Sequence, residues 1–88
     1  MKCARIIVTG TVQGVFFRSN TKRKAEELEI KGYAKNLRDG TVEVMAQGED
    51  EKVKQLIDFL TQSPRPSKVR TLKINYYELG HYRGFEIK

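Results

Sequence analysis

The chain has 88 residues, of which 39% are hydrophobic and 32% charged, and its net charge at pH 7 is +6. This size and composition exclude a disordered chain and leave no room for a second domain, so they predict one small globular domain over residues 1–88. The positive charge favours an anionic partner, such as a phosphorylated metabolite, nucleic acid or a membrane surface, without choosing among them.

Cys3 is the only cysteine and His81 the only histidine, which excludes an intrachain disulfide and a cysteine metal cluster and argues against zinc. The N-terminal apolar run is interrupted by Arg5, so it does not resemble a signal peptide, and no apolar run approaches the roughly 20 residues of a transmembrane helix. We therefore expect a cytoplasmic protein with no metal and no membrane partner.

Residues from Lys2 to Thr9 alternate as a half-buried strand does, with Ala4, Ile6 and Val8 on the expected inner face. The stretch Gly10-Thr-Val-Gln-Gly-Val-Phe-Phe-Arg18 follows it. Its glycines allow a tight turn, and peptide N–H groups that lead into a helix N-terminus converge on one small volume. With the planar guanidinium of Arg18, the turn is predicted to cradle an anion such as phosphate. The alternative is an ordinary strand-to-helix connection with a surface arginine.

A helix is predicted next, with Gly32 as its left-handed C-terminal cap. One stripe of this helix holds Phe17, Thr21, Ala25 and Leu28. The polar side chains from Ser19 to Thr21 could satisfy free N–H groups of the first turn, or contact a ligand.

Tyr33 to Arg38 is predicted as a second strand and Thr41 to Gln47 as a third, joined by Asp39-Gly40 as a two-residue hairpin turn. Ala34 and Asn36 share one face, so Asn36 is expected on the helix side near the strand's end. The alternative for Asn36 is an ordinary turn residue ahead of Asp39-Gly40. In the third strand Val42, Val44 and Ala46 are expected to point inward, and Glu43 and Met45 outward.

The acidic turn Glu49-Asp50-Glu51 opens a second amphipathic helix, which Ser63-Pro-Arg-Pro66 ends. Its apolar stripe holds Val53, Leu56, Ile57 and Leu60. A fourth strand, Val69 to Tyr77, and a short closing strand with Phe85 and Ile87 as its inward pair complete the chain. The order predicts an α+β ferredoxin-like sandwich, βαββαβ with a short fifth C-terminal strand and both helices on one face of an antiparallel or mixed sheet.

The residues also limit the chemistry. No cysteine lies in the turn before Arg18, and Val15-Phe16 follow Gly14 where a Walker-type site needs lysine and serine or threonine. The carboxylates are dispersed. A donor-rich cradle beside a polar amide, Asn36, suits hydrolysis of an already activated phosphate, because such a site need only neutralise charge and orient water.

Two segments of the chain resemble the signature segments of the acylphosphatases. They are Gly10-Thr-Val-Gln-Gly-Val-Phe-Phe-Arg18 and Gly32-Tyr-Ala-Lys-Asn-Leu-Arg-Asp-Gly-Thr-Val-Glu43. The resemblance implies a monomeric, cofactor-free hydrolase that cleaves the carboxyl–phosphate bond of acyl phosphates by direct attack of water, with inorganic phosphate as product and inhibitor. By the same resemblance Arg18 would hold the phosphoryl group and Asn36 would position the water. The implied phosphate-binding residues are Gln13, Gly14, Val15, Phe16, Phe17 and Arg18.

Some positions depart from the commonest form of the family. Tyr33 and Ala34 stand where tryptophan and valine are frequent, Phe16 occupies a variable position, and the chain ends in Lys88 where an aromatic residue is common. The last difference puts in question whether the C-terminal end steadies Arg18.

Two other functions fit the same architecture. A nucleic-acid-binding module would explain the positive charge, but the expected outward positions Arg5, Ile7, Glu43 and Met45 include no aromatic residue on which bases could stack. A catalytically silent domain that binds phosphate or carbamoyl phosphate is the third reading.

Overall fold

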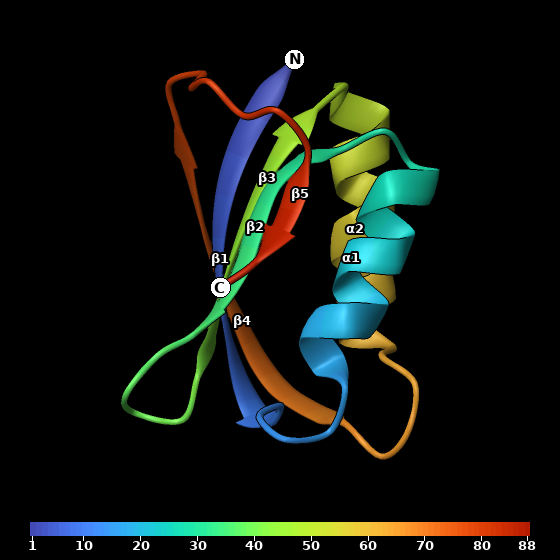
Figure 1. Ribbon diagram of the computed structural model, residues 1–88, viewed down its shortest axis with the longest axis vertical. Helices are drawn as coiled ribbons and strands as arrows, with labels where there is room; N and C mark the ends of the chain where they lie inside the picture. Colours follow the sequence, from blue (N-terminus) through green and yellow to red (C-terminus); the bar gives the residue numbers. More distant parts are fainter.

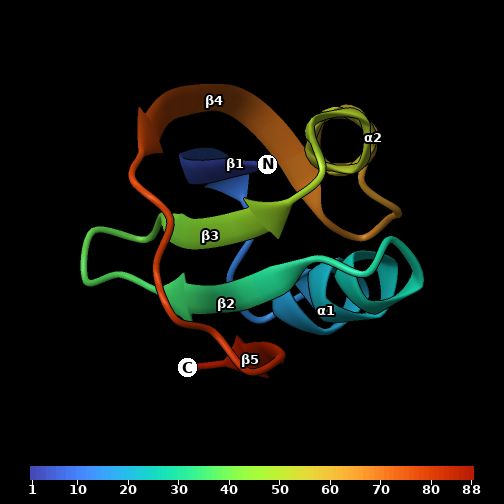
Figure 2. The ribbon, with the colours of Figure 1, turned by 90° about the horizontal axis from the view of Figure 1, so that it is seen from above.

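The computed structural model describes residues 1–88 and contains two helices and five strands. In chain order they are β1 (Lys2–Thr11), α1 (Phe17–Glu27), β2 (Lys31–Asn36), β3 (Val42–Gly48), α2 (Asp50–Thr61), β4 (Lys68–Tyr77) and β5 (Phe85–Ile87). The strands form one sheet in the order β4-β1-β3-β2-β5, which Figure 2 shows from above. Neither helix combines the length and the apolar composition needed to cross a membrane.

The sheet is mixed, because β5 runs parallel to β2 while the other neighbours are antiparallel. Both helices lie on one face of the sheet, and the other face carries no helix (Figure 1). This arrangement confirms the predicted ferredoxin-like α+β sandwich with a short fifth strand.

The core lies between the helices and the sheet. In β1 and β3 the residues predicted to point inward are fully buried: Ala4, Ile6 and Val8 in β1, and Val42, Val44 and Ala46 in β3. The predicted stripe of α1 is buried as well, and α2 contributes Val53, Leu56 and Leu60. The periodicity of the sequence therefore predicted most of the core, because burial of one face of each element is what the pattern encodes. Ile57, predicted in the stripe of α2, is only partly buried.

Helix α1 ends differently from the prediction. Glu29, with φ 58°, is the left-handed residue, and the N–H groups of Glu29 and Ile30 donate to the carbonyls of Glu26 and Ala25. This is a Schellman motif. Gly32 is instead a residue of β2 with φ 144°, where a Cβ would collide with the carbonyl oxygen of Met45.

Gly10 also lies in a strand and not in the turn. It sits at an irregularity in the pairing of β1 with β4, with φ 132°. A Cβ at Gly10 would collide with the carbonyl oxygen of Lys68 and the backbone nitrogen of Arg70. Close approach of two strands therefore explains this glycine.

The β2–β3 connection is longer than the predicted two-residue turn. β2 ends at Asn36, and a backbone pair between Leu37 and Thr41 encloses a three-residue loop. Gly40, with φ 90°, provides the left-handed residue, and the Asp39 carboxylate accepts hydrogen bonds from the backbone and hydroxyl of Thr41. Asn36 is thus the last residue of β2 and not part of the turn.

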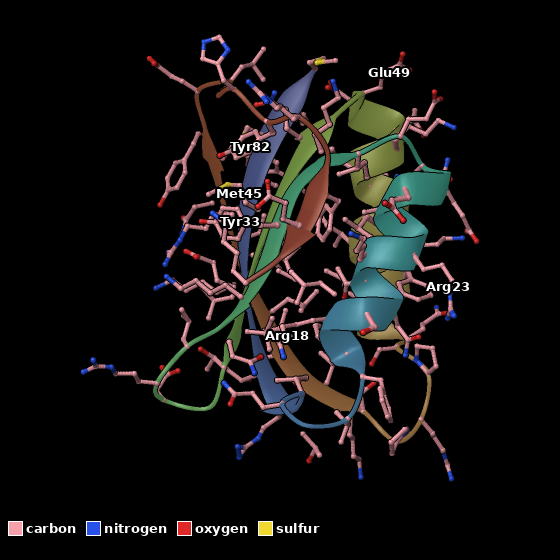
Figure 3. The ribbon with its side chains drawn as sticks, in the orientation of Figure 1. Arg18, Arg23, Tyr33, Met45, Glu49 and Tyr82 are labelled. Carbon is pink, nitrogen blue, oxygen red and sulfur yellow. The ribbon has the colours of Figure 1, made fainter.

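The helix-free face of the sheet is partly covered by the chain's own side chains. Glu43 is only 8% exposed, and its carboxylate accepts hydrogen bonds from the Arg5 guanidinium and, at 3.0 Å, from the Tyr33 hydroxyl. The Tyr82 ring lies 6.5 Å from that of Tyr33, and Figure 3 shows both near Met45. Glu43 and Met45 point away from the helices as predicted, but they are buried.

Because the Tyr33 hydroxyl is bonded to the Glu43 carboxylate, we expect the protein to lose stability at high pH. Burial and the hydrogen bond to Glu43 raise the pKa of Tyr33 from 10.0 to about 12. Because the pKa of Tyr33 is higher in the folded state, unfolding releases its proton between pH 10 and about 12. The stabilisation that the protonated Tyr33 provides is therefore complete below pH 10 and is lost as the pH rises to about 12. Denaturant unfolding across this range should show a steeper decline for the wild type than for Tyr33→Phe. Equal slopes would contradict the prediction.

Candidate functional site

The turn between β1 and α1 has alternating backbone handedness. Gly14 has φ 73° and Phe16 has φ 61°, whereas Val15 between them does not have a positive φ. Alternation of this kind directs successive N–H groups into a shallow concavity that attracts anions. A positive φ is costly for a bulky residue such as Phe16, so the surrounding structure holds the turn in this form.

The N–H groups of this segment have no acceptor within the protein. None of the backbone N–H groups from Gln13 to Ser19 donates a hydrogen bond to a backbone or side-chain atom. The first polar side chains of α1 do not cap them: Thr21 donates to the Phe17 carbonyl, and Asn20 accepts from Arg23. The partial positive charge of the α1 N-terminus is therefore free to act on a ligand.

The side chain of Gln13 fixes the turn against the β2–β3 hairpin. Its Nε2 donates to the carbonyl oxygens of Leu37 at 2.7 Å and Thr41 at 2.9 Å. These two residues form the backbone pair that follows Asn36 in the chain. The turn and the end of β2 are consequently held together by two hydrogen bonds.

Arg18 is anchored by the end of the chain. Its Nη1 donates to the carbonyl oxygen of Lys88 at 2.7 Å, and the N–H of Lys88 donates to the Ala34 carbonyl at 2.8 Å. Figure 3 shows Arg18 between α1 and the sheet, near the end of β5. Because a backbone carbonyl makes this contact, lysine in place of an aromatic residue at the last position leaves it intact.

Asn36 lies two residues beyond Ala34 on the same face of β2, toward the helices. Its Oδ1 atom is buried and is the one buried side-chain oxygen or nitrogen without a hydrogen-bond partner. A buried acceptor left unpaired costs about 1–3 kcal/mol. Such a cost is typical of an atom that serves a ligand or a bound water.

A pocket of about 240 Å³ lies at the N-terminus of α1. It is lined by Val12, Gly14, Phe16, Phe17, Arg18, Ser19 and Ile87. Arg18 is the only charged residue among them. Ile87 was expected to point inward with Phe85, but it is 41% exposed at this pocket, whereas Phe85 is buried.

Other hollows lack these features. One of about 540 Å³ lies where α2 meets β4, between Thr61 and Val69. The buried hydroxyl there, that of Ser67, is already hydrogen-bonded to Ser63 and Pro64. His81 is exposed, and no group of three or more histidine, cysteine, aspartate or glutamate side chains is arranged to hold a metal ion.

The structure links the sequence-predicted residues indirectly. Gln13 of the turn bonds Leu37 and Thr41, which follow Asn36 in the chain, and Arg18 bonds Lys88, whose N–H bonds Ala34 of the same strand. Arg18 lines the pocket at the N-terminus of α1, whereas Asn36 does not. The sequence did not reveal the contacts of Gln13 and Lys88. Gln13 was expected to bind phosphate and not to bond the hairpin, and a main-chain oxygen such as that of Lys88 leaves no trace in residue type.

Known proteins resemble this chain over nearly its full length. The profile of the Acylphosphatase family matches residues 4–87. An acylphosphatase of Vibrio parahaemolyticus is 44% identical over 87 residues, which cover 99% of this chain and 97% of the relative. The crystal structure of acylphosphatase from Bacillus subtilis superposes with a TM-score of 0.96 at 31% identity, over 100% of this chain and 99% of that one. An acylphosphatase from Coxiella burnetii gives 0.94 at 36%, over 99% and 92%.

Proposed function

Because the chain belongs to the acylphosphatase family and is a hydrolase that acts on acyl phosphates, we propose that water attacks the phosphorus of its substrate directly, without a metal ion. The products are a carboxylate and inorganic phosphate. One observation carries this proposal: a turn of unpaired N–H donors that includes Arg18 is bonded, through Gln13, to the residue that follows Asn36, whose buried side-chain oxygen is unpaired.

The turn binds the phosphoryl group in this mechanism. Its donors are the backbone N–H groups of residues 13–18, and Arg18 adds a full positive charge. The fixed orientation of these groups matters because donors that need no reorganisation stabilise the charge that develops on the phosphoryl oxygens. The hydrogen bond from Arg18 to the Lys88 carbonyl keeps part of the guanidinium in place while the remaining N–H groups face the substrate.

Asn36 positions the nucleophile. Its Oδ1 accepts a hydrogen bond from the attacking water, which directs a lone pair of the water oxygen toward phosphorus. An amide does not take up a proton at neutral pH. The water proton therefore passes to a phosphoryl oxygen of the substrate, as the new P–O bond forms and the bond to the acyl oxygen breaks.

The leaving group needs no acid from the protein. A carboxylic acid has a pKa near 4, so the departing carboxylate is stable without a proton at neutral pH. This agrees with a pocket in which Arg18 is the only charged lining residue. The protein's part is to orient the reactants and neutralise charge.

A chelator experiment tests the proposed function. Purified protein treated with EDTA is expected to hydrolyse benzoyl phosphate at the same rate as untreated protein, with inorganic phosphate as a competitive inhibitor. Loss of turnover on EDTA treatment, with recovery on adding a divalent metal, would overturn the metal-independent mechanism. Absence of turnover in both samples would overturn the proposed activity.

The cytoplasmic location and the monomeric state are further proposals from the sequence. A nucleic-acid partner finds less support. Tyr33 and Tyr82 lie on the helix-free face, but the Tyr33 hydroxyl is bonded to Glu43 and its ring is covered by the Lys88 ammonium group, so this ring is not displayed for base stacking.

A further inference from the structure

Phe16 occupies a position that favours a different residue. It has φ 61° and ψ 17° at the N-cap of α1, where glycine or asparagine fits without strain. Its side chain makes no capping hydrogen bond and is 74% exposed, so it contributes little to the core. Neither backbone preference, helix capping nor burial accounts for a phenylalanine here.

Phe16 shares its pocket with a second exposed apolar side chain. Ile87, from the opposite end of the chain, lines the same hollow and is 41% exposed. Single exposed apolar residues are common on proteins and need no explanation. Two of them that line one pocket with Arg18, brought together from residues far apart in sequence, give this pocket exposed apolar surface next to the proposed phosphoryl site.

The pocket has room for more than a phosphoryl group. Its volume of about 240 Å³ compares with about 30 Å³ for one water molecule in the liquid. No carboxylate lines it, and Arg18 is its only charged residue. A substrate that places its phosphoryl group on the turn would place an uncharged acyl group against Phe16 and Ile87.

We propose that Phe16 and Ile87 form an acyl-binding wall, which gives the enzyme a preference for acyl phosphates with an apolar, above all aromatic, acyl group over acetyl phosphate. This inference rests on the proposed function and names its substrate class. An aromatic acyl group packs against the Phe16 ring, and such ring pairs change an equilibrium by about three- to tenfold. Acetyl phosphate is too short to gain much of this contact.

The test compares kcat/KM for benzoyl phosphate with kcat/KM for acetyl phosphate. Phe16→Asn keeps a residue that tolerates a left-handed backbone, and Ile87→Ser removes the facing side chain. Each is expected to lower the benzoyl-to-acetyl ratio by about three- to tenfold. A small shift of the turn would lower kcat/KM for both substrates equally and would therefore leave the ratio unchanged. Leu79→Ser is the matched control, since Leu79 is 56% exposed and does not line the pocket.

A ratio that stays at the wild-type value in both variants would overturn the acyl-binding wall while leaving the proposed function in place. A fall of the same size in Leu79→Ser would also overturn it, because the effect would then not belong to this pocket. If the wild type hydrolyses neither substrate, the proposed function fails, and the acyl-binding wall fails with it.

Discussion

Arg18→Ala is expected to lower kcat/KM for benzoyl phosphate by about 10²–10³-fold, the usual cost of removing one positioned donor to a developing charge. The guanidinium is the only full positive charge among the residues that line the pocket, and the Lys88 carbonyl holds it in place. Inorganic phosphate should also bind more weakly, by about ten- to a hundredfold, since a hydrogen bond between charged groups contributes about 1.5–3 kcal/mol. Steady-state kinetics with phosphate as inhibitor measures both.

Arg23→Ala is the matched control for this variant. Arg23 lies on the same helix, carries the same charge and contacts only Asn20 through its side chain. It should retain nearly wild-type activity and phosphate inhibition, although it changes the net charge equally. Equal losses in the two variants would mean that overall charge attracts the substrate and that Arg18 has no special position.

Asn36→Ala is expected to lower kcat by about 10²-fold while the inhibition constant for phosphate stays near the wild-type value. The buried Oδ1 of Asn36 has no partner in the protein, so its loss removes an acceptor for the attacking water and leaves the donors of the turn intact. Misplacement of a reactant by about 1 Å costs a factor of this size. The separation between kcat and phosphate binding distinguishes a residue that positions water from one that holds phosphate.

Asn75→Ala provides the control for the amide. Asn75 is exposed on β4, on the opposite face of the sheet from the pocket, and pairs in register with Arg5. It should leave kcat unchanged. If Asn36→Ala weakened phosphate binding as much as Arg18→Ala does, the proposed division of roles between the two residues would be wrong.

Much of this architecture could be predicted from the sequence, for a physical reason. Alternation in β1 and β3 and the stripe of α1 record which side of each element is buried, and burial is the main term that a folded sequence must satisfy. The order of helices and strands, together with the right-handed crossover rule, then restricted the possible arrangements of the strands in the sheet to a few. Arg18 and Asn36 were proposed from their residue types, their place at element ends and the family resemblance, and their roles stay predictions.

The contacts that assemble the site could not be predicted. Gln13 bonds carbonyls more than twenty positions away, and Arg18 bonds the carbonyl of Lys88 at the other end of the chain. Local patterns contain no information on backbone acceptors at such separations. The same limit applies to Gly32, which was interpreted as a helix cap but is needed where β2 passes close to β3.

Side-chain burial on the helix-free face of the sheet could not be predicted either. Alternation correctly predicted that Glu43 points away from the helices. The pattern does not show that Arg5 and Tyr33 then cover that carboxylate. Ile87 shows the opposite error. It is apolar and was predicted to point inward, but it is exposed and lines a pocket.

The most direct test of the central claim is a crystal structure of the protein with inorganic phosphate. The proposed mechanism predicts a phosphate ion within about 2.7–3.2 Å of N–H groups from residues 13–18 and of the Arg18 guanidinium, with a water between the ion and Oδ1 of Asn36. Phosphate bound elsewhere, for example beside Lys68 and Arg70, with the turn unchanged and unliganded, would contradict it.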